Sequence, residues 1–270
     1  KRFQIGLFES VIFEPKDTLM NRGYDIEYLN PFLFYRPTEF SIGSQDRLLI
    51  GLNLSYQFKN LMIYAQLAID DFAFDELLDR SRWWANKYSG QFGFKGKSNL
   101  KGKSNLNSGQ LRYLSEINFA RPFTYTHLSE GTNYGHQGIS LAHPIGANFV
   151  ESFSEISVIF ENQLSLKAQF MFVQQGGVDG DNSTTFGADI YQPYTNRPFE
   201  YGYFIGANGR RNRARTSVEV SYPILPKASL TAFIRPAVEF IQFNDNPYES
   251  MFLFYGGIRT SLWNDRSFSF

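Results

Sequence analysis

The sequence predicts an all-β fold: an antiparallel transmembrane β-barrel of the outer-membrane type, with roughly 12–14 strands in this chain. Aromatic residues make up 17% of its 270 residues, yet the mean hydropathy is only −0.31. Apolar and polar residues alternate along many segments, and no apolar run reaches the ~20 residues that a membrane helix requires. We expect a single domain over residues 1–270, which forms either a whole barrel or the C-terminal part of a larger one.

The period of two residues is clearest in three segments. Segment 47–58 places six apolar residues on one face: Leu48, Ile50, Leu52, Leu54, Tyr56 and Phe58. Segments 163–173 and 216–224 alternate in the same way. Their lengths exceed the ~5–6 residues of a typical soluble strand and suit the ~9–11 residues of a membrane strand. Further strands are expected at 3–13, 61–72, 87–96, 109–120, 153–161, 199–208, 228–243 and 250–262. A soluble β-barrel or sandwich would show the same alternation and remains the alternative.

The connections between these segments are of two kinds. Short turns are expected at "KN" (59–60), "EN" (161–162) and "PK" (226–227). Long polar loops are expected at 14–46, 73–86, 121–152 and 174–198, and segment 70–87 has the pattern of one amphipathic helix. Short turns at one end and long loops at the other are typical of outer-membrane barrels.

Composition narrows the functional classes. The chain has 26 basic and 26 acidic residues, so no net positive charge favours nucleic acid as a partner. Cysteine is absent, which excludes disulfides, thiolate metal sites and a cysteine nucleophile. We expect no cofactor.

The three histidines lie close together in the sequence, in 121–148. His127 and Ser129 have the His-x-Ser spacing that would place a base beside a serine nucleophile on one strand face. The surrounding residues indicate a loop, however, and only Asn133 or Asn148 is available to orient the histidine. The spacing of His127, His136 and His143 matches no compact zinc pattern. We therefore expect no metal site and favour a protein that is not an enzyme, with a lipid hydrolase that uses His127 and Ser129 as an alternative.

Aromatic loop residues suggest recognition of carbohydrate. Trp83 and Trp84 are adjacent in a polar segment, where their rings would stack on sugars or else belong to a short helix packed at the barrel mouth. The full set of candidate carbohydrate-binding residues is Trp83, Trp84, Tyr88, Tyr125, His127, Tyr134 and His136. The cluster "GRRNRART" offers Arg210, Arg211 and Arg213 to an anionic glycan or to lipopolysaccharide, or it forms a solvated hairpin tip.

Several motifs together carry a resemblance: "LNPFLFYRP" (29–37), "YAQLAIDDF" (64–72), "WWANKYSGQFGFK" (83–95), "RPFTYTH" (121–127), "NYGH" (133–136) and "LAHPIGANFVE" (141–151). In their order and spacing the chain resembles the Wzi-type capsule-assembly outer-membrane proteins of Bacteroidetes, including the RemB-like gliding-motility proteins. The resemblance implies an integral protein of the cell outer membrane that binds, assembles or displays capsular or surface polysaccharide without catalysis, with a link to gliding and adhesion. Its expected partners are that polysaccharide, outer-membrane lipid and lipopolysaccharide. An accessory subunit of a larger secretion or motility complex and a diffusion porin are the alternatives.

Overall fold

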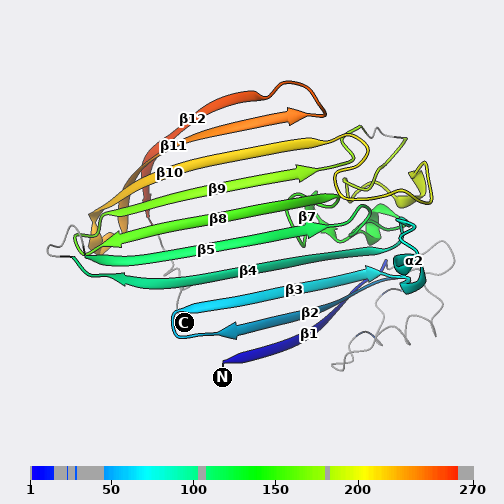
Figure 1. Cartoon of the computed structure of the whole chain (residues 1–270), viewed down its shortest axis with the longest axis horizontal. Coiled ribbons are helices and arrows are strands. Elements are labelled where there is room, and N and C mark those ends of the chain that lie inside the picture. The colour runs from blue at the N-terminus through cyan, green and yellow to red at the C-terminus, as the bar shows by residue number, and fades with distance from the viewer. Residues whose placement is uncertain are drawn as a thin grey trace.

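Ten long strands build the protein, according to a computed structural model that describes residues 2–14, 23, 28, 46–102, 108–179 and 183–260. The strands are β1 (Phe3–Ile12), β2 (Arg47–Gln57), β3 (Leu61–Asp71), β4 (Lys87–Leu100), β5 (Gly109–Ala120), β8 (Phe149–Phe160), β9 (Ser165–Gln175), β10 (Arg211–Leu225), β11 (Leu230–Phe243) and β12 (Glu249–Thr260). Each pairs antiparallel with the next, which gives one sheet in chain order (Figure 1). A separate hairpin joins β6 (Gly135–His136) to β7 (Ile139–Ser140). The all-β prediction is confirmed.

Every expected strand segment overlaps one of these ten strands, with one exception, although β4, β8, β9, β10 and β12 extend beyond the predicted bounds. Segment 199–208 is an irregular loop, so that prediction is wrong. Gly202 and Gly206 have φ angles of 91° and 85°, which break an extended strand. Tyr203, between them, is 1% exposed and packs among loop residues rather than in the sheet.

The two ends of the sheet differ as expected. The three predicted turns are confirmed and join β2 to β3, β8 to β9, and β10 to β11. Loops 72–86, 121–148 and 176–210 all leave the opposite end (Figure 1), while most of the predicted loop 14–46 lies outside the described residues. The predicted helix over 70–87 shrinks to α2 (Phe74–Leu78): β3 extends to Asp71, and Arg80 and Arg82 have φ angles of 53° and 56°, which a helix does not allow. No helix in the described ranges is long and apolar enough to cross a membrane.

The strand register gives the sheet one apolar face and one polar face. The apolar face continues across all ten strands and includes Ile5, Leu52, Leu67, Phe92, Ile117, Ile156, Phe170, Val218, Ile234 and Phe252. The polar face includes Gln66, Gln91, Asn118, Glu151, Gln169, Glu219 and Glu239. The alternation that predicted the strands therefore also sorts the side chains by chemistry.

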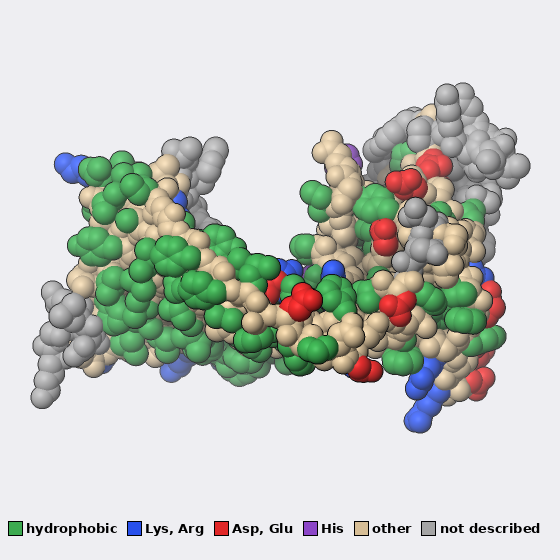
Figure 2. Space-filling model, turned by 90° about the horizontal axis from the view of Figure 1, so that it is seen from above, with side chains coloured by type: hydrophobic (Ala, Val, Ile, Leu, Met, Phe, Trp, Pro, Cys, Tyr) green, Lys and Arg blue, Asp and Glu red, His purple; other side chains and the backbone are tan. Residues whose placement is uncertain are grey.

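Exposure is reversed relative to a water-soluble sheet. Val218 and Ile234 on the apolar face are 47% and 50% exposed, whereas Glu219 and Glu239 on the polar face are 4% and 5% exposed. The polar face is the concave one, so its side chains crowd together. Figure 2 shows hydrophobic side chains gathered along one side of the molecule and a hollow on the other side, between the turn end and the loop end.

The sheet is open. Strands β1 and β12 each pair with one neighbour only among the described residues. Its ten strands are fewer than the roughly 12–14 that the sequence predicted for this chain. The described strands therefore do not close into a barrel by themselves.

Candidate functional site

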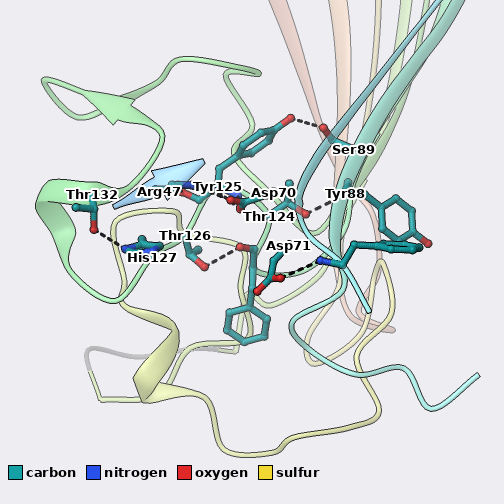
Figure 3. A network of polar contacts seen from close by, with 12 residues as sticks. Arg47, Asp70, Asp71, Tyr88, Ser89, Thr124, Tyr125, Thr126, His127 and Thr132 are labelled. Atoms are coloured by element: carbon teal, nitrogen blue, oxygen red, sulfur yellow. Dashed lines mark hydrogen bonds and ion pairs between the residues drawn. The ribbon is translucent and has the colours of Figure 1, made fainter. Parts of the chain in front are cut away.

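Loop 121–148 folds onto the polar face at the loop end of the sheet, and a buried ion pair fixes its position (Figure 3). Arg47 on β2 donates from Nε to Asp70 Oδ1 on β3 at 2.9 Å, and its Nη2 contacts the second carboxylate oxygen. Arg47 Nη1 also donates to the carbonyl of Tyr125, while the Tyr125 amide donates to Asp70 Oδ2 at 3.1 Å. The pair therefore holds both backbone polar groups of one loop residue.

The segment around Tyr125 is tightly folded. Phe123 and Tyr125 have φ angles of 65° and 74°, in the left-handed region that costs a non-glycine residue about 1 kcal/mol. The hydroxyls of Thr124 and Thr126 donate to the carbonyls of Tyr88 and Phe123 at 3.2 and 2.7 Å. Both threonines are fully buried, so these bonds satisfy polar groups that water does not reach.

Asn148 joins this loop to loop 176–210. Its side-chain amide donates to the Phe186 carbonyl at 3.2 Å, and its Oδ1 accepts from the Gly206 amide at 3.0 Å. Its backbone carbonyl accepts from Gly176 at 2.8 Å. Asn148 is completely buried and has a φ of 55°, a conformation that asparagine tolerates better than most residues. The two loops therefore form one packed unit above the sheet.

A row of amide side chains crosses the polar face beneath this unit. Asn53, Gln66, Gln91 and Asn118 are successive cross-strand partners on β2 to β5. Gln91 donates to Asn118 at 2.9 Å, and Gln66 donates to Asn53 at 2.6 Å. Asn118 in turn donates to Glu151 Oε2 at 2.9 Å. We call these four residues the amide row; each amide has both donor and acceptor capacity.

Three residues of the amide row, Gln66, Gln91 and Asn118, form the floor of a cavity of about 260 Å³ between the sheet and loop 121–148. The walls are largely aromatic: Tyr125 and Tyr134 stack with ring centroids 5.8 Å apart, and His143 stacks on Phe149 at 4.5 Å. Burial raises the pKa of Tyr125, so its hydroxyl stays neutral and donates to Ser89. None of the described residues that line this cavity is Asp, Glu, Lys or Arg. We call it the amide cavity.

Two of the seven carbohydrate candidates, Tyr125 and Tyr134, line the amide cavity. Trp84 does not: it is 9% exposed and lies in a second cluster with Phe123 and Tyr203. The Arg197 guanidinium is 4.0 Å from the Trp84 ring centroid, and the indole Nε1 donates to Glu200 at 2.8 Å. Protein atoms thus occupy its ring face, while Trp83 beside it is half-buried.

The remaining aromatic and histidine candidates lie apart from the cavity. Tyr88 pairs with Ile69 and is on the apolar face, where its ring contacts Phe119 edge-on at 6.4 Å. His136 is exposed on β6. A role for Trp83, Tyr88 or His136 in sugar binding stays a prediction.

His127 and Ser129 lie in the loop, as their surroundings indicated. His127 Nδ1 is 2.6 Å from the Thr132 hydroxyl, and Ser129 Oγ donates to Glu14 at 2.8 Å. The Thr132 hydroxyl lies between the two side chains, since it is also 2.9 Å from Ser129 Oγ. Burial, together with the nearby Arg47 and Lys87, lowers the pKa of His127 to about 4. Among the described contacts no hydrogen bond joins His127 directly to Ser129, the contact that base activation requires.

The arginine cluster is not a hairpin tip, and that reading is wrong because β10 begins at Arg211. Arg213 lies on the polar face and its Nε is 2.7 Å from Glu239. Arg211 donates to Gln175 at 2.5 Å, and Arg210 at the strand end is 3.3 Å from the exposed Asp245. Their contact with an anionic glycan or lipopolysaccharide stays a prediction.

Within the described ranges, no group of three or more His, Cys, Asp or Glu residues is arranged to hold a metal ion. The chain was compared with protein-family models, curated proteins and solved structures, and none of them matches. Its function therefore has to be inferred from the fold and the site.

Sequence reasoning missed the floor of the cavity. Gln66, Gln91 and Asn118 come from three strands, and only the register shows that they are neighbours. An amide at a polar-face position is ordinary for a solvated strand, so none of the three marks the site by itself. His143 was considered only as a metal ligand, and it lines the cavity instead.

Proposed function

We propose that this chain is part of the wall of a β-barrel in the cell outer membrane and binds a capsular or surface polysaccharide on its polar, lumen-facing side, without catalysis. The observation that carries the membrane part is the reversed exposure of the sheet, with apolar side chains outward and polar ones inward. Membrane barrels have this distribution because their outer surface contacts lipid and their interior contacts water. The long loops at one end and short turns at the other support the same conclusion.

A soluble sandwich fits these observations less well. It would cover its apolar face with a second sheet or with helices, as every layered soluble fold does. No second layer covers that face in the described part of the chain, and β12 exposes Phe252, Phe254 and Ile258 by 64–68%.

The amide cavity supports polysaccharide as the ligand. Sugar hydroxyls both donate and accept hydrogen bonds, which matches the amide row, and sugar rings have apolar faces that suit Tyr125, Tyr134 and Phe8. The cavity has no carboxylate pair of the kind that glycoside hydrolysis uses. The resemblance to Wzi-type capsule-assembly and RemB-like proteins points the same way and implies a link to gliding and adhesion.

Capsule retention by cells tests this proposal. The variants Gln91→Ala and Tyr134→Ala each remove one recognition group from the cavity, and each is expected to weaken polysaccharide binding about tenfold. Gln169→Ala is the matched control, because Gln169 is also on the polar face but bonds to Glu155 on β8, away from the cavity. Equal binding by all three variants and the wild type would contradict the proposed site.

The open edges favour a second candidate function, that of an accessory subunit in a larger outer-membrane secretion or motility complex. β1 and β12 each leave one row of backbone groups without a strand partner among the described residues. Purification in mild detergent would then recover this protein with other subunits. A stable isolated monomer would count against it.

The lipid hydrolase alternative has its own test. Ser129 contacts Glu14 and Thr132 rather than His127, so the Ser129→Ala variant is expected to leave envelope lipid turnover unchanged. A loss of turnover in that variant would restore the hydrolase hypothesis.

A further inference from the structure

A buried carboxylate lies directly behind the amide cavity. Glu151 on β8 is 8% exposed and does not line the cavity, but both of its side-chain hydrogen-bond partners do. Asn118 donates to Glu151 Oε2 at 2.9 Å, and His143 Nε2 is 3.0 Å from the same oxygen. Among the described residues His143 alone is within ion-pair distance of Glu151, so the protonation of this histidine decides whether the carboxylate charge is balanced.

The hydrogen bonds of His143 show that it is neutral. Its Nδ1 accepts from the Ile145 amide at 3.3 Å, and a ring nitrogen that accepts a hydrogen bond carries no proton. The one ring proton is therefore on Nε2, which donates it to Glu151. Arg47 and Asp70, which hold Tyr125 in the cavity wall, form an ion pair with each other. No described residue in contact with Glu151 thus balances its negative charge.

Glu151 also fixes the direction of the amide row. An ionised carboxylate only accepts hydrogen bonds, so the Asn118 amide nitrogen faces Glu151 and its carbonyl oxygen faces Gln91. Gln91 must then donate to Asn118, while its cross-strand partner Gln66 donates the other way, to Asn53. The side-chain carbonyl oxygens of Gln66 and Gln91 accept no hydrogen bond from a described residue. The cavity floor therefore offers two free acceptors on directly opposed residues.

A protonated amine matches this floor. An ammonium group donates three hydrogen bonds and accepts none, so it suits free carbonyl oxygens better than a hydroxyl, which also needs donors. The faces of Tyr125 and Tyr134 in the wall attract cations, and no lysine or arginine is among the described lining residues to repel one. The charge of Glu151, one amide away from Gln91, favours the same ligand.

We propose that the amide cavity selects a sugar unit that carries a protonated amine. Glu151 is its positioning residue: it does not touch the sugar, but it orients Asn118 and Gln91 and supplies the negative charge behind them. This inference rests on the proposed function and adds the chemical class of the bound sugar to it. With a volume of about 260 Å³, the cavity is smaller than most pockets for drug-sized ligands, which suits one unit of a longer chain.

Calorimetric titration of the full chain in detergent tests the inference with three oligosaccharides. Hexaglucosamine, cellohexaose and hexa-N-acetylglucosamine share one backbone and differ in a single substituent, which is an amine, a hydroxyl or an acetamide. Hexaglucosamine is expected to bind at least about tenfold more tightly than the other two, because its hydrogen bonds are charge-assisted. Its affinity is expected to fall as salt rises, whereas that of cellohexaose stays constant.

The variant Glu151→Gln separates the charge of this residue from its shape. It is expected to weaken hexaglucosamine binding about tenfold and to change cellohexaose binding by less than about twofold, since a general loss of structure would weaken both. Glu155→Gln is the matched control, because Glu155 is also a polar-face carboxylate of β8 but bonds to Gln169, outside the cavity. Hexaglucosamine should bind this control as it binds the wild type.

A second variant tests the floor without touching the buried carboxylate. Gln91→Met keeps the length of the side chain and removes its carbonyl oxygen, so it is expected to reduce the preference for hexaglucosamine over cellohexaose by about tenfold. An undiminished preference in Gln91→Met, or in a folded Glu151→Gln, would place the amine elsewhere and overturn the inference.

The wild-type titrations separate the two proposals. Equal affinity for hexaglucosamine and cellohexaose, or tighter binding of the N-acetylated oligomer, would overturn the amine subsite and leave glycan binding standing. No binding of any of the three would contradict glycan binding and the subsite together.

Discussion

Arg47 and Asp70, on adjacent strands, form an ion pair whose side chains are only 2% and 3% exposed. Because the same two side chains bond to both backbone groups of Tyr125, the pair links the sheet to loop 121–148. The ion pair thereby fixes the position of Tyr125, in the wall of the amide cavity, relative to the amide row on the sheet.

Breaking this ion pair is expected to destabilise the folded protein strongly. Asp70→Asn leaves the Arg47 charge buried without its carboxylate, so we expect the free energy of unfolding to fall by about 3–5 kcal/mol. Denaturant unfolding in detergent measures this change. The double variant Arg47→Met with Asp70→Asn is expected to recover part of the stability but to leave 121–148 sensitive to limited proteolysis. Lys167→Met, which removes a half-exposed partner of Glu155, should change stability by less than about 1 kcal/mol.

Asn148 allows backbone strain and side-chain bonding to be measured separately. Asn148→Gly keeps the positive φ and removes two side-chain hydrogen bonds, for an expected loss of about 2 kcal/mol. Asn148→Ala adds the left-handed penalty of about 1 kcal/mol. Thermal unfolding of the two variants gives the difference. Equal stabilities for Gly and Ala would show that the backbone at this position relaxes.

His127 is expected to make the protein less stable in mild acid. Its pKa is about 4 in the folded chain, below the ordinary value of 6.5, so the unfolded chain binds the proton more readily. Its contribution to stability is complete above pH 6.5 and is lost as the pH falls toward 4, by at most about 3 kcal/mol. Unfolding of the wild type and of His127→Gln from pH 7 to 4.5 isolates this effect from the carboxylates. His136→Gln, which changes an exposed histidine, should follow the wild-type curve.

Substitution by arginine is expected to have different effects on the two faces of β9. Phe170 is on the apolar face and 46% exposed, so in a bilayer Phe170→Arg is expected to cost about 2–4 kcal/mol near mid-membrane. The neighbouring Gln169→Arg points to the polar face and should be nearly neutral. In a water-soluble protein an exposed Phe170→Arg would change stability by only about 0.5 kcal/mol. Unfolding in lipid vesicles therefore tests the membrane location itself.

The strands could be predicted from the sequence because their period is local. Segment 47–58 corresponds to β2 (Arg47–Gln57) and segment 61–72 to β3 (Leu61–Asp71), since alternate residues lie on an apolar or a polar face whatever lies further along the chain. Segment 199–208 alternates as well, but Gly202 and Gly206 let it turn. Alternation is therefore a reliable guide only where no residue adopts a positive φ.

The site was harder to predict because it depends on pairing between strands. Tyr125 and Tyr134 were recognised from loop composition, and both line the amide cavity. Gln91 gave no such signal, since an amide at alternate positions is ordinary for a solvated strand. Its neighbour Asn118 is set by the β4–β5 register, which the sequence does not reveal.

The open sheet has a consequence for how the protein reaches its final state. In β1, with its 10 residues, about half of the backbone N–H and C=O groups point to the side where no described strand pairs with them, and the same holds for β12. Inside a bilayer each such group costs several kcal/mol, so two bare seams would cost tens of kcal/mol. Under the proposed membrane location, entry into lipid and sealing of the seams would have to occur in one concerted event, because an inserted but unsealed sheet would be far less stable than one still in water.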